Sequence, residues 1–181
     1  SSANMLADVA DIRISADGSI ELNNTQAAGN INVASGSDRI IQRGDAFAMG
    51  DITYSGTGFT NRGNVNALGN LDIDGYIDNQ SGRFAANGNI TLHTGGIISN
   101  SGGSIILAGD TGRIRVYGND SLEIQGGEIK SAGGIEIEMT GNVTLSSDIS
   151  SLYADRYFNV DGLNFINGTN LLLNGSVNVN V

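Results

Sequence analysis

The sequence LDIDGYIDNQSGRFAANGNITLHTGGIISNSGGSIIL, residues 71–107, contains one pattern of apolar residues twice in succession. Ile90 takes the position of Leu71 in the next repeat, and Ile98 takes that of Ile77. The pattern extends along most of the chain as three interleaved series, which keep pace with one another. A fixed period of about 20 residues is typical of a stacked array, because each unit can bury its apolar face only against its neighbours. The three series are Ile12, Ile31, Ile52, Leu71, Ile90, Ile114 and Ile135; Ile20, Ile40, Phe59, Ile77, Ile98, Leu122 and Val143; and Phe47, Val65, Phe84, Ile105, Ile129 and Ile149.

Each unit of the array is predicted to consist of short β-strands. Apolar residues alternate around the first series, as in Ile31-Asn32-Val33 and Ile90-Thr91-Leu92. This period-2 alternation is typical of a strand with one face in a core and the other in water. Gly, Asn, Asp and Ser bound the runs and supply turns. We therefore predict an all-β chain that folds as a single right-handed parallel β-helix, a solenoid of about 8–9 coils with 19–24 residues each.

The composition and the spacing predict one continuous rod. The 181 residues include 27 Gly and no Pro, which suits tight corners and a backbone that donates hydrogen bonds throughout. All three series take their longest step at the same place, after positions 90, 98 and 105, so we expect three extra residues near positions 110–112. Residues 1–150 are predicted as regular coils, and residues 151–181 as divergent last coils of the same rod without a separate domain. Neither end carries an obvious polar cap, so we expect the rod to continue into further coils.

A polar repeat accompanies the apolar one. Asn61, Asn79 and Asn100 each follow an anchor of the second series by two residues. Gly-Asn or Gly-Asp pairs, such as Gly69-Asn70, likewise precede anchors of the first series. Stacked amide side chains can hydrogen-bond from coil to coil and satisfy backbone groups at the corners. We interpret these residues as a structural ladder; the alternative is a polar stripe that binds a ligand.

Residues 77–92, IDNQSGRFAANGNITL, resemble the repeat of the filamentous haemagglutinin family. In that repeat an apolar residue is followed by Asn, then by one or two Gly, and then by a Gly-polar-apolar-any-apolar strand. The resemblance is clear over residues 50–110, weaker over 11–49 and 111–150, and poor after that. Residues 1–150 are therefore similar to coils of the haemagglutinin-repeat type.

The resemblance implies a function in adhesion or in recognition of a target cell. Members of the family are very large bacterial exoproteins, including adhesins and effectors of contact-dependent growth inhibition, which an outer-membrane partner exports in two-partner secretion. The secretion domain of the family carries Asn-Pro-Asn motifs, which this Pro-free chain lacks, so the chain is similar to the shaft or to a receptor-binding stretch. The implied location is secreted or on the bacterial cell surface, as part of a larger exported protein. The implied partner is an outer-membrane protein or a surface glycan of another cell, and a passive shaft without a ligand is the alternative.

Charge and hydropathy exclude several classes of partner. Nine basic and 19 acidic residues give a net charge of −10, which disfavours nucleic acid and anionic membrane surfaces as ligands. No apolar run approaches the roughly 20 residues of a membrane-spanning helix, and residues 1–5 show no signal peptide. We therefore expect no membrane insertion. The chain has no Cys, so no disulfide contributes to its stability.

An aromatic segment near the C-terminus is the candidate recognition surface. Two Tyr, one Phe and one Arg gather there, where the earlier coils carry mainly aliphatic residues. Tyr and Arg are enriched where proteins bind one another. We therefore predict a recognition patch formed by Tyr153, Arg156, Tyr157 and Phe158. The alternative is that these aromatic rings fill or seal the last coil of the rod.

Signals for catalysis are weak. His93 is the only His and has no neighbouring Ser or Cys nucleophile motif, so we interpret it as a solvated loop residue. Asp72, Asp74 and Asp78 could serve a polysaccharide-degrading β-helix enzyme, which needs two carboxylates across a sugar-binding groove. The chain has few insertions to wall such a groove, and it has no Trp. We predict no enzymatic activity, no cofactor and no bound metal; the alternatives are a polysaccharide-degrading enzyme, which is remote, and a weak divalent-cation site at Asp72 and Asp74, which point to the same side of a strand.

Overall fold

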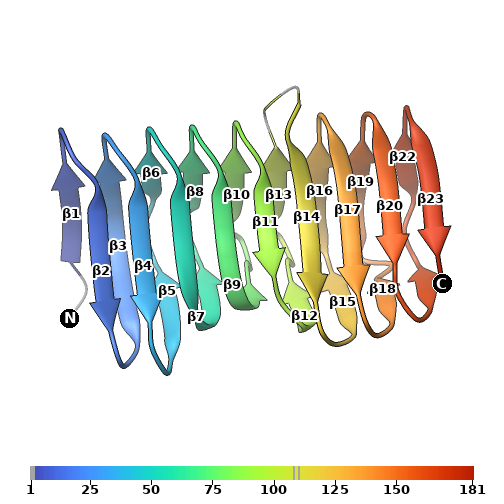
Figure 1. Ribbon diagram of the computed structural model, residues 1–181, viewed down its shortest axis with the longest axis horizontal. Helices are drawn as coiled ribbons and strands as arrows, with labels where there is room; N and C mark the ends of the chain where they lie inside the picture. Colours follow the sequence, from blue (N-terminus) through green and yellow to red (C-terminus); the bar gives the residue numbers. More distant parts are fainter. Residues whose placement is uncertain (1–2, 108, 110) are drawn as a thin grey trace.

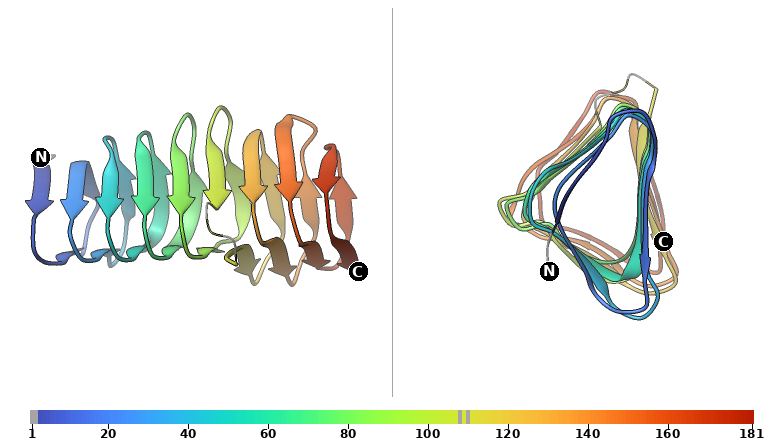
Figure 2. Two further views of the ribbon diagram at one scale, coloured as in Figure 1. Left: turned by 90° about the horizontal axis from the view of Figure 1, so that it is seen from above. Right: turned by 90° about the vertical axis from the view of Figure 1, so that its left-hand side faces the viewer.

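The computed structural model describes residues 3–107, 109 and 111–181. Its 23 strands form one sheet, which winds into a rod of about eight turns. The chain runs down the near side of the rod and up the far side while it advances toward the C-terminus, so the coils are right-handed (Figure 1). Viewed along its axis, the rod is triangular (Figure 2). The predicted all-β parallel β-helix is confirmed.

Three faces form the triangle, and each is a ladder of parallel strands. The first face consists of β2 (Ile12–Ala16), β4 (Ile31–Ser35), the start of β7 (Ile52–Asn61), the start of β9 (Leu71–Asp78), β11 (Ile90–His93), β14 (Arg113–Gly118), β17 (Gly134–Met139), β20 (Tyr157–Asp161) and β23 (Ser176–Asn180). The second face consists of the start of β3 (Ile20–Ala27), β5 (Arg39–Gln42), the ends of β7 and β9, β12 (Gly96–Ser99), β15 (Leu122–Gln125), β18 (Val143–Leu145) and β21 (Phe165–Asn167). The third face consists of β1 (Ala3–Ala7), the end of β3, β6 (Ala46–Ala48), β8 (Asn64–Ala67), β10 (Arg83–Ala86), β13 (Ser104–Leu107), β16 (Gly127–Ser131), β19 (Ile149–Ala154) and β22 (Leu171–Leu173).

The core is a set of apolar rows that run along the inside of the rod. Successive members of the first predicted series pair in register from Ile12 to Ile135, and all of them are buried. An aromatic stack fills the middle of the N-terminal half, where the rings of Tyr54 and Phe59 have centroids 4.3 Å apart. Burial of these rows away from water is the main force that holds the coils together.

The second series changes register in the middle of the rod. Ile98 pairs with Ile124, whereas the predicted partner, Leu122, pairs with Gly96. The coil is therefore longer on this face than the spacing indicated, and the predicted pairing of Ile98 with Leu122 is wrong. Leu122 and Ile124 are both buried, so the apolar pattern could not decide between these two registers.

The third series is wrong at its two ends. Ala46, rather than Phe47, pairs with Val65, and Phe47 is only partly buried on the outward side of β6. At the other end Leu152 takes the place predicted for Ile149, after an irregularity in the pairing of β16 with β19. Phe47 was assigned to the core because it is large, but β6 turns the small side chains of Ala46 and Ala48 inward instead.

The extra residues of the longest coil lie between the third and the first face. Ala86 pairs with Leu107, and Ile90 pairs with Ile114. The connection from Leu107 to Ile114 is therefore three residues longer than the one from Ala86 to Ile90, in agreement with the predicted insertion. Asp110, which belongs to the predicted insertion, lies outside the described residues.

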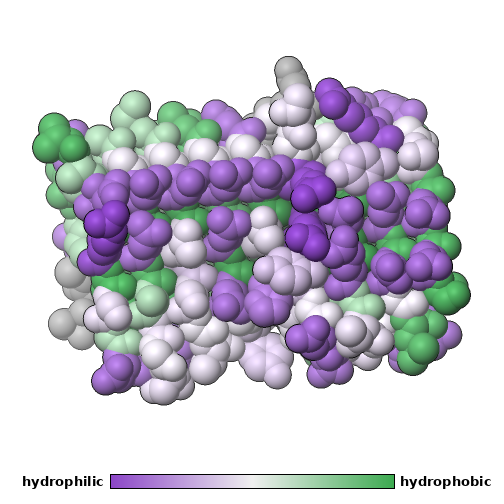
Figure 3. All heavy atoms as spheres, viewed as in Figure 1, coloured by the Kyte–Doolittle hydropathy of each residue, from purple (hydrophilic) through white to green (hydrophobic). Residues whose placement is uncertain are grey.

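A ladder of Asn and Asp side chains runs along the edge where the first-face strands begin. Each Oδ1 accepts a hydrogen bond from a backbone N–H of the next coil, as where Asn70 N donates to Asp51 Oδ1 at 2.6 Å. The members are Asp11, Asn30, Asp51, Asn70 and Asn89, and the last accepts from the N–H of Arg113. Figure 3 shows a hydrophilic band along this edge. A Gly precedes each member after Asp11 and leaves room for the ladder, because a Cβ at Gly69, for example, would collide with Asp51 Oδ1.

Candidate functional site

The predicted recognition patch does not form one exposed surface. Phe158 is fully buried, with its ring centroid 6.1 Å from that of Phe165, because it occupies an inward position that pairs with Ile135. Its assignment to an exposed patch is therefore wrong. Tyr157 lies on the outward side of the first face, and its ring covers Gly134, where a Cβ would collide with it.

Tyr153 lies on the third face, around a corner from β20. Its hydroxyl donates a hydrogen bond to Asp155 Oδ1 at 2.9 Å and accepts one from Asn174 Nδ2 at 3.1 Å. The bond to Asp155 raises the pKa of the Tyr153 phenol. Asn174 Nδ2 also donates to Asp155 Oδ1 at 2.9 Å, and this bond lowers the pKa of Asp155. Of the four predicted residues, Arg156 alone is largely exposed. The polar end of Tyr153 is thus already engaged within the rod.

The three predicted ladder residues lie in line at the corner between the second and third faces. Asn61, Asn79 and Asn100 are fully buried. Asn61 Nδ2 donates to Asn79 Oδ1 at 2.9 Å, and Asn79 Nδ2 donates to Asn100 Oδ1 at 2.7 Å. This is the geometry of a structural ladder, and full burial leaves these amides inaccessible to a ligand.

His93 lies in β11, so its interpretation as a loop residue is wrong. Its Nδ1 is 3.0 Å from Asp74 Oδ1, and its ring stacks on that of Tyr117 with 4.6 Å between centroids. The Arg115 guanidinium lies 4.8 Å from the Tyr117 centroid and pairs with Glu138, whose hydrogen bond raises the pKa of Arg115. These side chains form a row that crosses successive coils on the outside of the first face.

An imidazole beside a carboxylate can act as an acid–base pair, but it needs a reacting group within reach. In the described part of the chain, no hydroxyl hydrogen-bonds to His93. Over the same residues no group of three or more His, Cys, Asp or Glu side chains is arranged to hold a metal ion. Nor do the described ranges contain a helix with the length and apolarity to cross a membrane.

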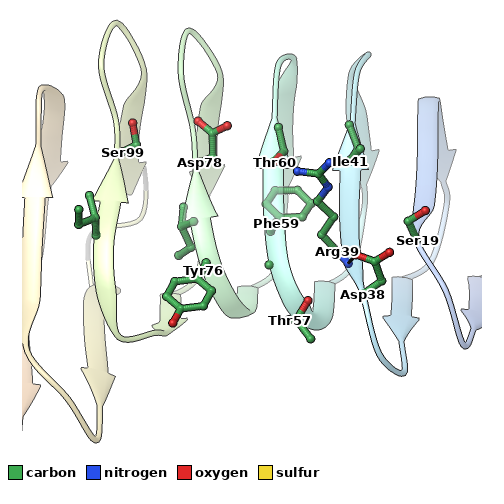
Figure 4. A pocket seen from close by; sticks show the side chains of 13 residues that line it. Ser19, Asp38, Arg39, Ile41, Thr57, Phe59, Thr60, Tyr76, Asp78 and Ser99 are labelled. Carbon is green, nitrogen blue, oxygen red and sulfur yellow. Dashed lines mark hydrogen bonds between the residues drawn. The ribbon is translucent and has the colours of Figure 1, made fainter.

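The outward side of the second face carries a groove of about 560 Å³ (Figure 4). The register aligns Arg39, Gly58, Tyr76 and Ile97 on successive coils. Gly58 has no side chain, so it leaves a notch between Arg39 and Tyr76. A Cβ at Gly58 would meet only ordinary contacts, the nearest at 3.5 Å, so the notch has room for a larger residue.

Tyr76 forms one wall of the groove and is 67% exposed. The preceding Gly75 has a φ of +121°, and a Cβ there would collide with the carbonyl oxygen of Gly56, so the corner requires glycine. The Tyr76 ring leans on Gly96, where a Cβ would lie 3.1 Å from a ring carbon. One edge of the ring therefore lies close to the Gly96 backbone, and the rest of the ring is exposed.

Arg39 forms the opposite wall of the groove and is exposed. None of the ion pairs among the described residues includes it, whereas Arg62 and Asp78 pair at 3.2 Å beside the groove. Thr57 and Thr60 add hydroxyl groups to the lining. The groove therefore combines an exposed ring, an unpaired guanidinium and hydrogen-bonding hydroxyls, which is the composition of a binding site.

Sequence reasoning missed this groove, although the signal was present. Arg39, Gly58 and Tyr76 each directly precede an inward anchor of the second series, so alternation turns all three outward. An outward row that changes from Arg to Gly to Tyr predicts a notch beside an aromatic wall. The second series gives the register of these three coils correctly, so the row could be read from the sequence; it was missed because only the inward residues were compared between coils.

Comparison of the chain with protein-family models, with curated proteins and with solved structures gives no match. The class of protein is therefore defined by geometry alone. It is a parallel β-solenoid with hydrogen-bonded polar ladders and a groove on its outer surface. Solenoids of this type present extended surfaces for binding, so the outward residues carry the functional argument.

Proposed function

We propose that this protein is a non-enzymatic recognition rod of a secreted or surface-exposed bacterial exoprotein, and that it binds a component of another cell's surface. The observation that carries the proposal is the groove walled by Tyr76 and Arg39. Aromatic and Arg side chains supply most of the binding energy in recognition surfaces. Most residues that line the groove also lie within residues 50–110, where the resemblance to the filamentous haemagglutinin repeat is clearest; the exceptions are Ser19, Asp38, Arg39 and Ile41.

The rod explains how such a groove would work. Each coil adds about 4.8 Å of length, so a stack of coils carries a binding site away from the cell that displays it. The resemblance supports export by an outer-membrane secretion partner and a role as an adhesin or a growth-inhibition effector. Catalysis is not part of the proposal, because Asp78 pairs with Arg62 and because no hydroxyl hydrogen-bonds to the His93–Asp74 pair in the described part of the chain.

Binding of the fluorescently labelled protein to a panel of intact Gram-negative strains tests the proposal. We expect saturable binding that weakens at least about tenfold in Tyr76→Ala, which removes one wall. Gly58→Gln should have the same effect, because it fills the notch without a backbone clash. The matched control is Thr144→Gln, which adds the same side chain at an outward position of β18, outside the groove.

Two outcomes would contradict the proposal. Absence of binding to every strain would leave a passive shaft as the function of the rod. Binding that is lost only when Tyr153, Arg156 and Tyr157 are changed together to Ala would place the site at the C-terminal coils. Circular dichroism of each variant establishes that it is folded before its binding is measured.

A further inference from the structure

The groove on the second face continues around a corner of the rod. Thr57 and Tyr76, which line it, also line a second depression of about 280 Å³. Asp74 and His93 of that depression in turn line a third, of about 240 Å³, on the first face. We call these three connected depressions the corner groove. The Tyr76 ring stands between the first and the second of them.

The corner groove is long and shallow. Arg39, Gly58, Tyr76, His93 and Tyr117 lie on successive coils along it. Four steps between coils, each of about 4.8 Å, span roughly 20 Å. This shape suits an extended chain that lies across several coils, and a compact small molecule would leave most of it empty.

Aromatic side chains line the corner groove on both the second and the first face. The exposed Tyr76 ring stands in the middle, and the stacked rings of His93 and Tyr117 lie at the first-face end. The exposed Tyr76 ring can pack against the apolar C–H face of a sugar ring, while hydroxyl groups around it bind the sugar edges. Eight Ser and Thr residues line the path, and two of them, Thr57 and Thr60, line the first depression together with Tyr76.

The charges of the corner groove limit the ligand further. Five carboxylates line it: Asp38, Asp72, Asp74, Asp78 and Asp120. They repel an anionic chain, whereas they accept hydrogen bonds from neutral hydroxyl groups. The pairing of Asp74 with His93 and of Asp78 with Arg62, together with the unpaired Arg39 at one end, reduces the attraction of the groove for a strongly cationic chain.

We infer that the corner groove binds an uncharged oligosaccharide of roughly four sugar units, with one sugar ring packed against Tyr76. The sugar hydroxyls donate hydrogen bonds to the carboxylates and accept them from Arg39 and the Thr hydroxyls. The inference rests on the proposed function and specifies the class of its ligand.

Isothermal titration with the intact protein tests the inference. The probes are cellohexaose, maltohexaose, mannohexaose and chitohexaose, with hexagalacturonate as the anionic chain and hexalysine as the cationic one. We expect at least one neutral hexasaccharide to bind, and its disaccharide to bind at least about tenfold more weakly, because it fills only part of the path. Tyr76→Ala should weaken the hexasaccharide at least about tenfold, and Thr144→Gln should leave its affinity unchanged.

Four results would overturn the inference: no neutral hexasaccharide binds, either charged chain binds more tightly, the disaccharide binds equally well, or Tyr76→Ala has no effect. Treated target cells separate this failure from failure of the proposed function. Binding that is abolished by periodate oxidation of the cells and survives protease supports a glycan ligand. Groove-dependent binding that survives periodate but is lost after protease would keep the proposed function and overturn the oligosaccharide. Absence of binding to untreated cells would overturn the proposed function itself.

Discussion

Gly69 shows why Gly-Asn and Gly-Asp pairs recur along one edge of the rod. A Cβ at this position would occupy the place of Asp51 Oδ1, which accepts a hydrogen bond from Asn70 N. Gly69→Ala must therefore displace the Asp51 carboxylate, and we expect it to lower the free energy of unfolding by about 1–3 kcal/mol. Urea denaturation followed by circular dichroism measures the change.

Gly18→Ala is the matched control, because nothing lies within 4 Å of a Cβ at Gly18. Its free energy of unfolding should stay within about 1 kcal/mol of the parent. The cause can be checked with a double-mutant cycle, in which Asp51→Ala should reduce the cost of Gly69→Ala. Equal costs for Gly18→Ala and Gly69→Ala would show that the ladder does not restrict the corner.

At the scale of the strands, the buried amide ladder joins the coils at the corner between the second and third faces. Asn79 is its middle member, and Asn79→Ala leaves Asn100 Oδ1 without its donor and Asn61 Nδ2 with only its longer bond to the Arg83 carbonyl oxygen, at 3.4 Å. Buried polar groups without partners are costly, so we expect a loss of about 2–4 kcal/mol in the free energy of unfolding. Asn66→Ala removes an outward amide that makes no side-chain hydrogen bond among the described residues, and it should cost less than about 1 kcal/mol. Similar losses in both variants would contradict the ladder as a source of stability.

Element type and order could be predicted from the sequence, because alternation and turn residues are local signals. Register was harder to predict. Leu122 and Ile124 are both apolar and both inward, so the apolar pattern alone does not decide which of them meets Ile98. The error at Phe158 has a related cause, because an aromatic residue was counted as exposed before its side of the strand was assigned. The groove was missed because it depends on neighbours from different coils.

At the scale of the whole rod, the buried Tyr54 makes the free energy of unfolding fall with rising pH in the alkaline range. Burial raises the pKa of its phenol above the ordinary value of about 10, and its hydroxyl donates a hydrogen bond to Gln42 Oε1 at 3.1 Å. The folded rod therefore keeps this proton while the unfolded chain releases it above about pH 10. The stabilisation is complete below about pH 10 and is lost as the pH rises further, by about 1.4 kcal/mol for each pH unit.

Tyr54→Phe should remove most of this pH dependence. The titration is simple to interpret, because the chain has no Cys and Lys130 is its single Lys. Near pH 8 the variant should be less stable than the parent by about 1 kcal/mol, because Gln42 Oε1 loses a donor. The two stabilities should meet about one pH unit above pH 10 and then cross, since only the parent continues to lose the contribution of Tyr54. Urea denaturation between pH 8 and pH 11.5 measures both curves.

Tyr153→Phe is the comparison, and it should remove a smaller part of the pH dependence of stability, because Tyr153 is only partly buried and its pKa is raised mainly by the hydrogen bond to Asp155. Parallel curves for Tyr54→Phe and the parent would mean that the Tyr54 phenol does not keep its proton in the folded rod.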